Sequence, residues 1–311
     1  MVVGVTVRVD RMSVDQMPEA DAAPAWWPSR YGAGDELGSL NEVESVNVLV
    51  AAGLVRRGIV FDLAHVLDEH SPAFPGRTFR QWMHESAPAG GIGENHVHWV
   101  AERLEATTQM GTHVDALNHL HDGDRTYNGH RVGDIFDTVG SSKLGAETLP
   151  QVVTRGVLLD IAGVRGVRRM EPGDVITPAD ADAALAKVWL TLRPGDAVLF
   201  HTGWGTQWDD DPAAYTTGEP GPGVEMIQWL ADHRVAITGC DTWSFGPVPP
   251  ENPARPFEVP QILNTRYGVV IMENLRLRDI AASGHREFMF VMSHPKLRGA
   301  TGAWIAPLAI V

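Results

Sequence analysis

The stretch QMGTHVDALNH, residues 109–119, concentrates side chains that bind metals or move protons. On a strand, alternate residues face the same side, so His113 and Asp115 project together with their Cα atoms roughly 6 to 7 Å apart. From that distance an imidazole and a carboxylate can converge on one divalent ion. Gln109 lies roughly 13 Å from His113 on a straight strand, so it joins them only if the chain bends, and Gly111 permits a bend.

His119 is the residue of this stretch that suits proton transfer. It approaches Asp115 only if the chain turns over residues 116–118. An imidazole with an ordinary pKa of about 6.5 can take a proton from water and return it to a leaving group. An H-x-D pair also occurs on ordinary strands, where hydrogen bonds satisfy the ring. An exposed polar face is therefore the alternative interpretation, since burying four polar side chains without partners would be costly.

Composition and charge indicate a compact protein that binds neither nucleic acid nor membranes. Hydrophobic residues make up 44% of the chain and charged residues 21%, which excludes wholesale disorder. The net charge of −14 repels phosphate groups, and no cluster of Lys and Arg offsets it. The single cysteine, Cys240, cannot form an internal disulfide, and the sequence shows neither a signal peptide nor an apolar run of membrane-spanning length. We therefore expect a cytoplasmic protein.

The elements that must position the 109–119 stretch alternate between strands and helices. Short, β-branched-rich segments predict buried strands over residues 58–64, 156–162, 196–203, 234–241, 268–275 and 286–292. Helices are predicted over residues 41–58, where Asn41 and Glu44 have the spacing of a capping box, over 177–191, where Thr177 precedes a proline, and over 223–235. This pattern favours a mixed α/β fold, and the long loops at 209–223 and 246–260 are typical of functional loops.

The 109–119 stretch resembles a motif of the cyclase superfamily of metal-dependent hydrolases, which includes kynurenine formamidase and isatin hydrolase. The family pattern is H-x-G-T-H-x-D-x-x-x-H, and the chain keeps it except at Gln109, which replaces the first His. Downstream, Glu273 lies in a family-like ENL segment, whereas Gln261 stands where the family has a His. The segments 32–41, 201–204, 240–244 and 286–310 are also similar to the longer members of the family.

The resemblance implies one domain over residues 1–311 with the swivelling β/β/α fold, in which residues 1–40 form an N-terminal arm or cover. It also implies that His113 and Asp115 are metal ligands, that Glu273 is a further or bridging ligand, and that His119 is the general acid/base.

The two glutamines change the expected metal chemistry. A neutral carboxamide binds zinc more weakly than an imidazole does and shifts the preference toward manganese or magnesium. We therefore expect one divalent ion, manganese or zinc, held by His113 and Asp115 with help from Gln109 and Glu273. A second ion, with Gln261 as a ligand, is left open.

The expected activity is hydrolysis of an amide or ester in a small molecule, cyclic lactams and lactones included. The ion would lower the pKa of its water to about 7 for zinc and polarise the substrate carbonyl, while His119 moves the proton. The chain has no G-x-S-x-G motif, which disfavours a serine nucleophile. Side chains expected to line the pocket for a planar substrate are His98, Trp99, His201, Trp243 and Phe245.

Three other classes stay open at this point. A metal-dependent lyase or cyclase could use the same ion and histidine, and loss of two imidazoles could leave a metal-free small-molecule-binding protein. A redox enzyme is the weakest alternative, because no G-x-G-x-x-G follows a predicted strand. We expect a homo-oligomer, because homo-oligomers are common and members of the family form dimers or tetramers.

Overall fold

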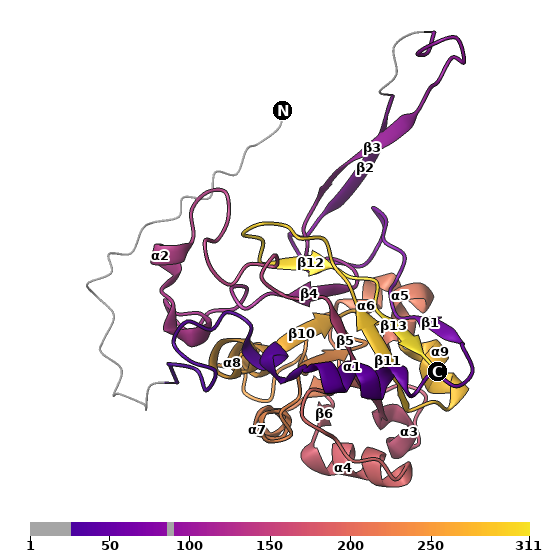
Figure 1. The fold of residues 1–311 in the computed structure, drawn as a ribbon. Helices are drawn as coiled ribbons and strands as arrows, with labels where there is room; N and C mark the ends of the chain where they lie inside the picture. Colours follow the sequence, from indigo (N-terminus) through magenta and orange to yellow (C-terminus); the bar gives the residue numbers. More distant parts are fainter. Residues whose placement is uncertain (1–25, 86–89) are drawn as a thin grey trace, which may run out of the picture.

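The computed structural model describes residues 26–85 and 90–311. In that part of the chain, nine strands form one mixed sheet with the order β1-β13-β11-β5-β7-β9-β10-β4-β12. Helices and long loops cover the sheet, and a separate hairpin stands away from it (Figure 1). The mixed α/β class expected from the sequence is confirmed.

The large sheet consists of β1 (Val60–Asp62), β4 (His113–Asp115), β5 (Val152–Asp160), β7 (Ala197–His201), β9 (Ile237–Cys240), β10 (Val270–Glu273), β11 (Glu287–Met292), β12 (Gly302–Trp304) and β13 (Leu308–Ile310). Two smaller pairs are β2 (Phe79–Glu85) with β3 (Val100–Ala106), and β6 (Val175–Ile176) with β8 (Gly221–Pro222). The helices are α1 (Ser45–Ala52), α2 (Val132–Ile135), α3 (Ile161–Arg165), α4 (Pro178–Lys187), α5 (Gln207–Asp210), α6 (Pro212–Tyr215), α7 (Glu225–Asp232), α8 (Glu258–Ile262) and α9 (Arg278–Ser283).

The centre of the large sheet is parallel. β5, β7, β9 and β10 run in one direction, and β4 joins β10 antiparallel. On one face, Leu185 of α4 and Leu230 of α7 pack with Phe200 of β7. Because these four strands are parallel, their carboxyl ends meet at one edge of the sheet, where open α/β sheets commonly hold ligands.

All six predicted strands are present, as β1, β5, β7, β9, β10 and β11, and two of the predicted helices are α4 and α7. Thr177 caps α4 by accepting a hydrogen bond from the backbone of Asp180. The predicted start of the first helix is wrong, because α1 begins at Ser45 after Glu44. The backbone N–H of Glu44 donates to the side chain of Asn47 (2.8 Å), so the capping pair lies three residues later than expected.

Residues 26–40 pack against the loop that follows the 109–119 motif. The guanidinium of Arg125 lies 4.9 Å from the ring centroid of Trp27, and the hydroxyl of Tyr127 donates to the carboxylate of Asp35 (2.7 Å). Residues 1–25 of the expected arm lie outside the described residues. Within the described chain, no helix has both the length and the apolar character needed to cross a membrane.

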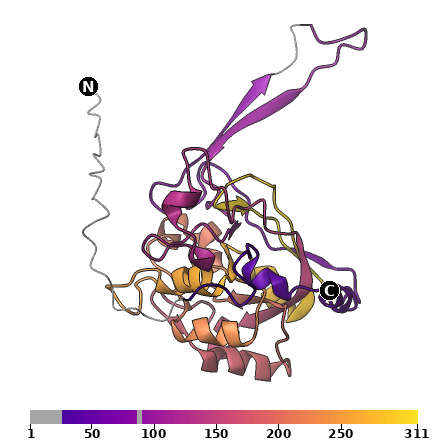
Figure 2. The same cartoon turned by 60° about the vertical axis from the view of Figure 1, so that its left-hand side comes forward.

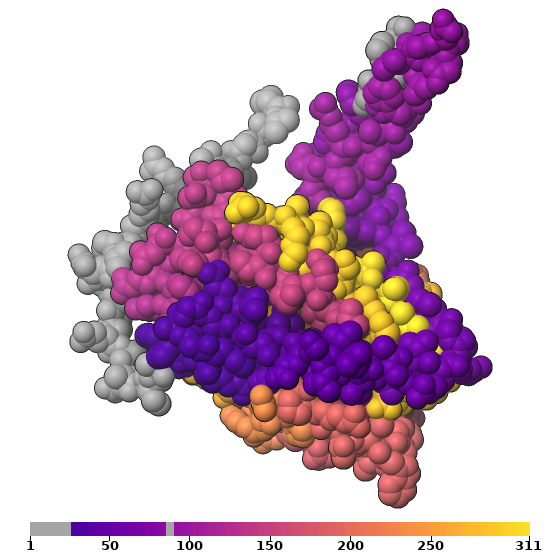
Figure 3. All heavy atoms as spheres, in the orientation of Figure 1, coloured from indigo at the N-terminus to yellow at the C-terminus, as the bar shows by residue number. Residues whose placement is uncertain are grey.

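The β2–β3 hairpin was not predicted from the sequence. Its strands pair from Phe79 opposite Ala106 outward, and the hairpin stands clear of the rest of the chain (Figures 2 and 3). Exposed Met83, Val100 and Leu104 project from one face, because the cross-strand pairing puts them in phase. A hairpin alone is marginally stable in water, so a partner that covered this face would stabilise it. The expected homo-oligomer stays a prediction.

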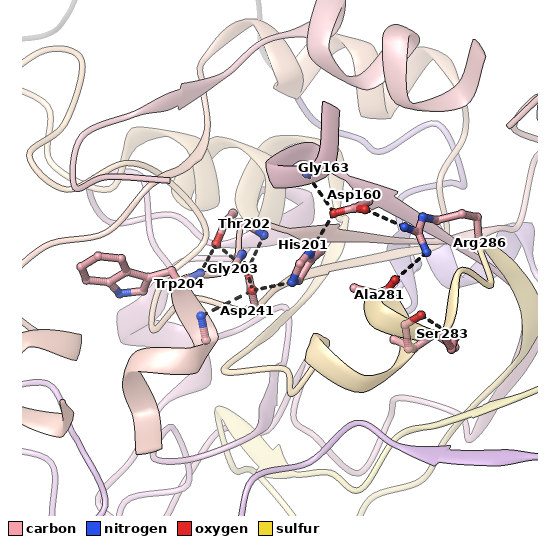
Figure 4. A network of polar contacts seen from close by, with 12 residues as sticks. Asp160, Gly163, His201, Thr202, Gly203, Trp204, Asp241, Ala281, Ser283 and Arg286 are labelled. Carbon is pink, nitrogen blue, oxygen red and sulfur yellow. Dashed lines mark hydrogen bonds and ion pairs between the residues drawn. The ribbon is translucent and has the colours of Figure 1, made fainter. Parts of the chain in front are cut away.

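A polar network joins the ends of β5, β7 and β9 (Figure 4). Nδ1 of His201 donates to Asp160 (2.8 Å), and Nε2 lies 4.0 Å from Asp241. Asp160 also accepts from Arg286 (2.6 Å), and Asp241 accepts from the backbone of Thr202 (2.8 Å). Burial alone would lower the pKa of His201, but the hydrogen bond to Asp160 and the two carboxylate charges outweigh burial and raise it.

This raised pKa makes stability depend on pH. The protonated ring stabilises the folded chain fully below its unfolded pKa of about 6.5, and that contribution is lost as the pH rises through the folded pKa. We expect the free-energy difference of unfolding between the wild type and His201→Gln to shrink as the pH rises above about 6.5. Urea denaturation over a pH series measures it, and parallel curves for the two proteins would contradict it.

Arg155 ties together the centre of the sheet. The side chain is fully buried on β5, and its Nε and Nη2 donate to Asp196 at 2.9 and 2.6 Å. Its Nη1 donates to Glu287 of β11 at 2.7 Å, and Nη2 also donates to the carbonyl of Thr191 at 2.7 Å. One guanidinium therefore satisfies acceptors on three residues from two segments, the loop before β7 and strand β11.

Arg155→Met should destabilise the fold strongly. The substitution leaves Asp196, which is 1% exposed, as a buried carboxylate without its partner. We expect the free energy of unfolding to fall by about 3–5 kcal/mol in urea denaturation. The control is Arg165→Met, which breaks the more exposed pair with Asp180 and should cost about 0–1 kcal/mol. Equal losses in the two variants would show that the buried pair has no special weight.

Candidate metal centre

Three side chains that could hold a metal ion meet where β4 lies between β10 and β12. In the antiparallel pairing of β10 with β4, Glu273 stands directly opposite His113. Asp115 faces the same side as His113, because alternate residues of a strand share a face. One ligand atom from each of His113, Asp115 and Glu273 lies within 4.8 Å of the other two, and all three residues are buried.

The backbone fixes the ring of His113. Its Nδ1 lies 2.8 Å from the carbonyl oxygen of Gly111, which can only accept, so Nδ1 carries a proton and donates. Nε2 then faces Asp115 Oδ1 at 3.5 Å and Glu273 Oε2 at 3.3 Å. Both Nε2 and Asp115 Oδ1 are buried and lack a hydrogen-bond partner among the described residues. A divalent cation fits this donor set, and the hydrogen bond from Nδ1 is the usual way of orienting a histidine ligand.

The cluster favours positive charge, as the pKa values of its own side chains show. Burial alone would lower the pKa of His113, but its close contacts with the carboxylates of Asp115 and Glu273 outweigh burial and raise the pKa to about 9. Burial would likewise raise the pKa of Asp115, but the positive charges of His119 and His113 outweigh burial and lower the pKa. The site therefore favours a cation among its oxygens.

The chain bends on both sides of β4. Gly111 has φ of +70°, and a Cβ there would lie 3.0 Å from the side chain of Leu67. After β4 the backbone of His119 donates to the carbonyl of Ala116 (3.1 Å), which is the turn expected from the sequence. Nε2 of His119 consequently lies 3.9 Å from Asp115 Oδ1, with 22% of the His119 side chain exposed.

The two glutamines make other contacts. The amide nitrogen of Gln109 donates to Thr301 (2.8 Å), and its carbonyl oxygen accepts from Thr108 (3.0 Å). The amide nitrogen of Gln261 donates to the carbonyl of His121 (2.7 Å). Both carboxamides therefore bond to neutral partners, and the expected roles of Gln109 beside the ion and of Gln261 at a second ion stay predictions.

A cavity of about 130 Å³ opens beside the cluster. Three aromatic rings form its wall, with centroid separations of 5.4 Å for Phe74–Trp243, 6.2 Å for Phe74–Phe257 and 6.1 Å for Trp243–Phe257. The complete lining is Phe74, Arg77, Asp115, His119, Leu120, Trp243, Ser244, Phe257, Pro260 and Glu273. Two of the three cluster residues and His119 thus face a space with an aromatic wall.

Of the five expected pocket residues, Trp243 lines this cavity and the structure places the other four elsewhere. His98 and Trp99 are exposed on the segment leading into β3, because the hairpin carries them away from the body. His201 belongs to the network with Asp160, and Phe245 is fully buried in the core beneath the sheet.

The sequence did not point to several of the lining residues, among them Phe74, Arg77 and Phe257. Phe74 and Arg77 flank a Pro-Gly pair, and the backbone of Arg77 donates to the carbonyl of Phe74 (3.0 Å). The Pro-Gly pair predicts a turn, but it does not show which part of the fold the turn faces. Phe257 lies in the long 246–260 loop, whose length alone had marked it as functional.

Comparisons with known proteins agree with this architecture. A crystal structure described as a novel cyclase is 27% identical, with a TM-score of 0.82 over 90% of this chain and 96% of that one. Isatin hydrolase A from Labrenzia aggregata shares the fold at 21% identity and a TM-score of 0.61, over 86% of this chain and 99% of that one. The Ralstonia solanacearum enzyme of the same name gives 20% identity and a TM-score of 0.59, over 86% and 97%.

No curated protein matches the chain. A family model described as "Putative cyclase" matches residues 61–247, which is more than half of the sequence. The chain therefore belongs to the cyclase family.

Proposed function

We propose that this cyclase-family chain is a metal-dependent hydrolase that opens an amide or ester bond of a small carbonyl compound, cyclic ones included. The observation that carries the proposal is the buried group of His113, Asp115 and Glu273, with His119 beside it at a cavity. Structures of the same fold include isatin hydrolases, one of them bound to benzyl benzoate, and a predicted metal-dependent hydrolase. These likenesses support the reaction class.

The proposed cofactor is one divalent ion, manganese or zinc, held by His113, Asp115 and Glu273. Such an ion, when bound, supplies an acidified water and polarises a carbonyl oxygen. Two carboxylate donors favour a hard ion such as manganese, while the imidazole also suits zinc. A single ion is proposed because Gln109 and Gln261 have other partners.

His119 is the proposed general acid/base. Its ring lies next to Asp115 yet stays partly exposed toward the cavity, so it can both take a proton and release it. It would accept the proton of the attacking water as the new C–O bond forms, then donate it to the nitrogen or oxygen that leaves. The rings of Phe74, Trp243 and Phe257 would hold a planar group and exclude water.

The first experiment combines metal content with isotope labelling. Elemental mass spectrometry counts divalent ions per chain, and a panel of aromatic amides, lactams and lactones is turned over in ¹⁸O-enriched water. One ion per chain and ¹⁸O in the product carboxylate support the hydrolase. Turnover without label favours a lyase or cyclase, and no bound ion after dialysis against manganese or zinc favours a metal-free binding protein.

His119→Ala should separate catalysis from metal binding. We expect turnover to fall by about 10²–10⁴-fold, the usual contribution of a general acid/base, with metal content unchanged. His121→Ala is the matched control, because His121 does not line the cavity. Loss of the ion together with turnover would instead make His119 a ligand.

Glu273→Gln should show how much the carboxylate charge, as distinct from the side-chain shape, contributes to metal binding. The variant keeps the side-chain size but removes one carboxylate charge from the cluster, so we expect metal content well below that of the wild type. Glu219→Gln is the control, because it makes the same change at a buried carboxyl outside the cluster, whose pKa burial, followed by the charge of Glu273, raises well above its usual range. The proposed ligand set fails if both variants hold the ion equally well.

A further inference from the structure

We propose that Arg77 is a carboxylate-binding residue of the cavity, so that the substrate is a small aromatic compound bearing an anionic group. This inference deepens the proposed function and rests on it for the reaction. Arg77 lines the same cavity as Asp115, His119 and Glu273.

A tight turn aims Arg77 at the cavity. Pro75 and Gly76 occupy its centre, Gly76 has φ of +90°, and the backbone of Arg77 donates to the carbonyl of Phe74 (3.0 Å). Both ends of the turn therefore line the cavity, and the guanidinium carbon lies 5.7 Å from the Phe74 ring centroid. Nη1 also donates to the carbonyl of Gln109 (2.5 Å), which anchors one side of the group.

The remaining N–H donors of the Arg77 guanidinium can bind a ligand. An arginine carries five N–H donors, and the bond to Gln109 uses one of them. Among the described residues, no carboxylate oxygen lies within 4.0 Å of the Arg77 nitrogens. Arg155 and Arg286, by contrast, are paired with carboxylates, Arg155 with Asp196 and Arg286 with Asp160. Arg77 therefore has no carboxylate in direct contact among the described residues, although its charge acts on Asp115 at longer range.

The charges around the cavity favour an anion. Asp115 and Glu273 supply two negative charges, which one divalent ion would balance. Arg77 then leaves the loaded cavity with a net positive charge. Its planar fork matches a carboxylate, and the aromatic wall beside it suits a ring attached to that carboxylate.

Benzoate and benzamide make a matched pair of probes, equal in shape and different in charge. In isothermal titration calorimetry on metal-loaded wild type, we expect benzoate to bind at least about tenfold more tightly than benzamide. Arg77→Gln should lose that preference and leave benzamide affinity unchanged, while Arg77→Lys, which keeps the charge but not the fork, should be intermediate. Arg80→Gln, on the exposed face of β2, should behave as wild type.

Metal content of each variant, measured on the same samples, distinguishes the possible failures. If Arg77→Gln keeps both its ion and the benzoate preference, the ion itself binds the carboxylate and the inference is overturned. Equal affinity of the wild type for the two probes also overturns it. If the chain binds no ion and yet shows a benzoate preference that depends on Arg77, the carboxylate site stands and the proposed hydrolase fails.

Discussion

Two carboxylates buried beside one imidazole are the constraint around which this chain is organised. Asp115 and Glu273 come from neighbouring strands and face Nε2 of His113 within 3.5 Å. Negative groups held out of water in this way are costly unless a cation lies among them. The antiparallel insertion of β4 between β10 and β12 creates the arrangement, and the carbonyl of Gly111 orients the ring.

The same edge of the sheet shows how a structural carboxylate differs from an available one. Asp241, at the end of β9, accepts hydrogen bonds from the backbone and hydroxyl of Thr202. Asp160 is bonded to His201 and Arg286. Asp115 Oδ1, by contrast, has no hydrogen-bond partner among the described residues. Acidic side chains at strand ends are thus common here, and the unsatisfied one marks the site.

The parts of the fold that could be predicted are those set by local pattern. β-branched runs identified the buried strands because such runs have few alternatives to a packed sheet. The spacing of His113 and Asp115 predicted their common face, because alternate residues of a strand face the same side. The hydrogen bond of Gln109 could not be predicted, because its partner, Thr301, comes from a distant segment. Likewise, the Pro-Gly pair signals a turn near Arg77, but only the tertiary fold shows that it faces the cavity.

The pairing of β4 with β10 also links the site to the whole fold. His113 and Glu273 lie in distant parts of the sequence and become neighbours only when the sheet is complete. An ion that needs both side chains binds the folded chain and not the unfolded one, so binding stabilises the fold by mass action, by about 2.7 kcal/mol at a hundredfold excess over Kd. The local supply of that ion would then set how long the protein resists unfolding as well as how fast it works.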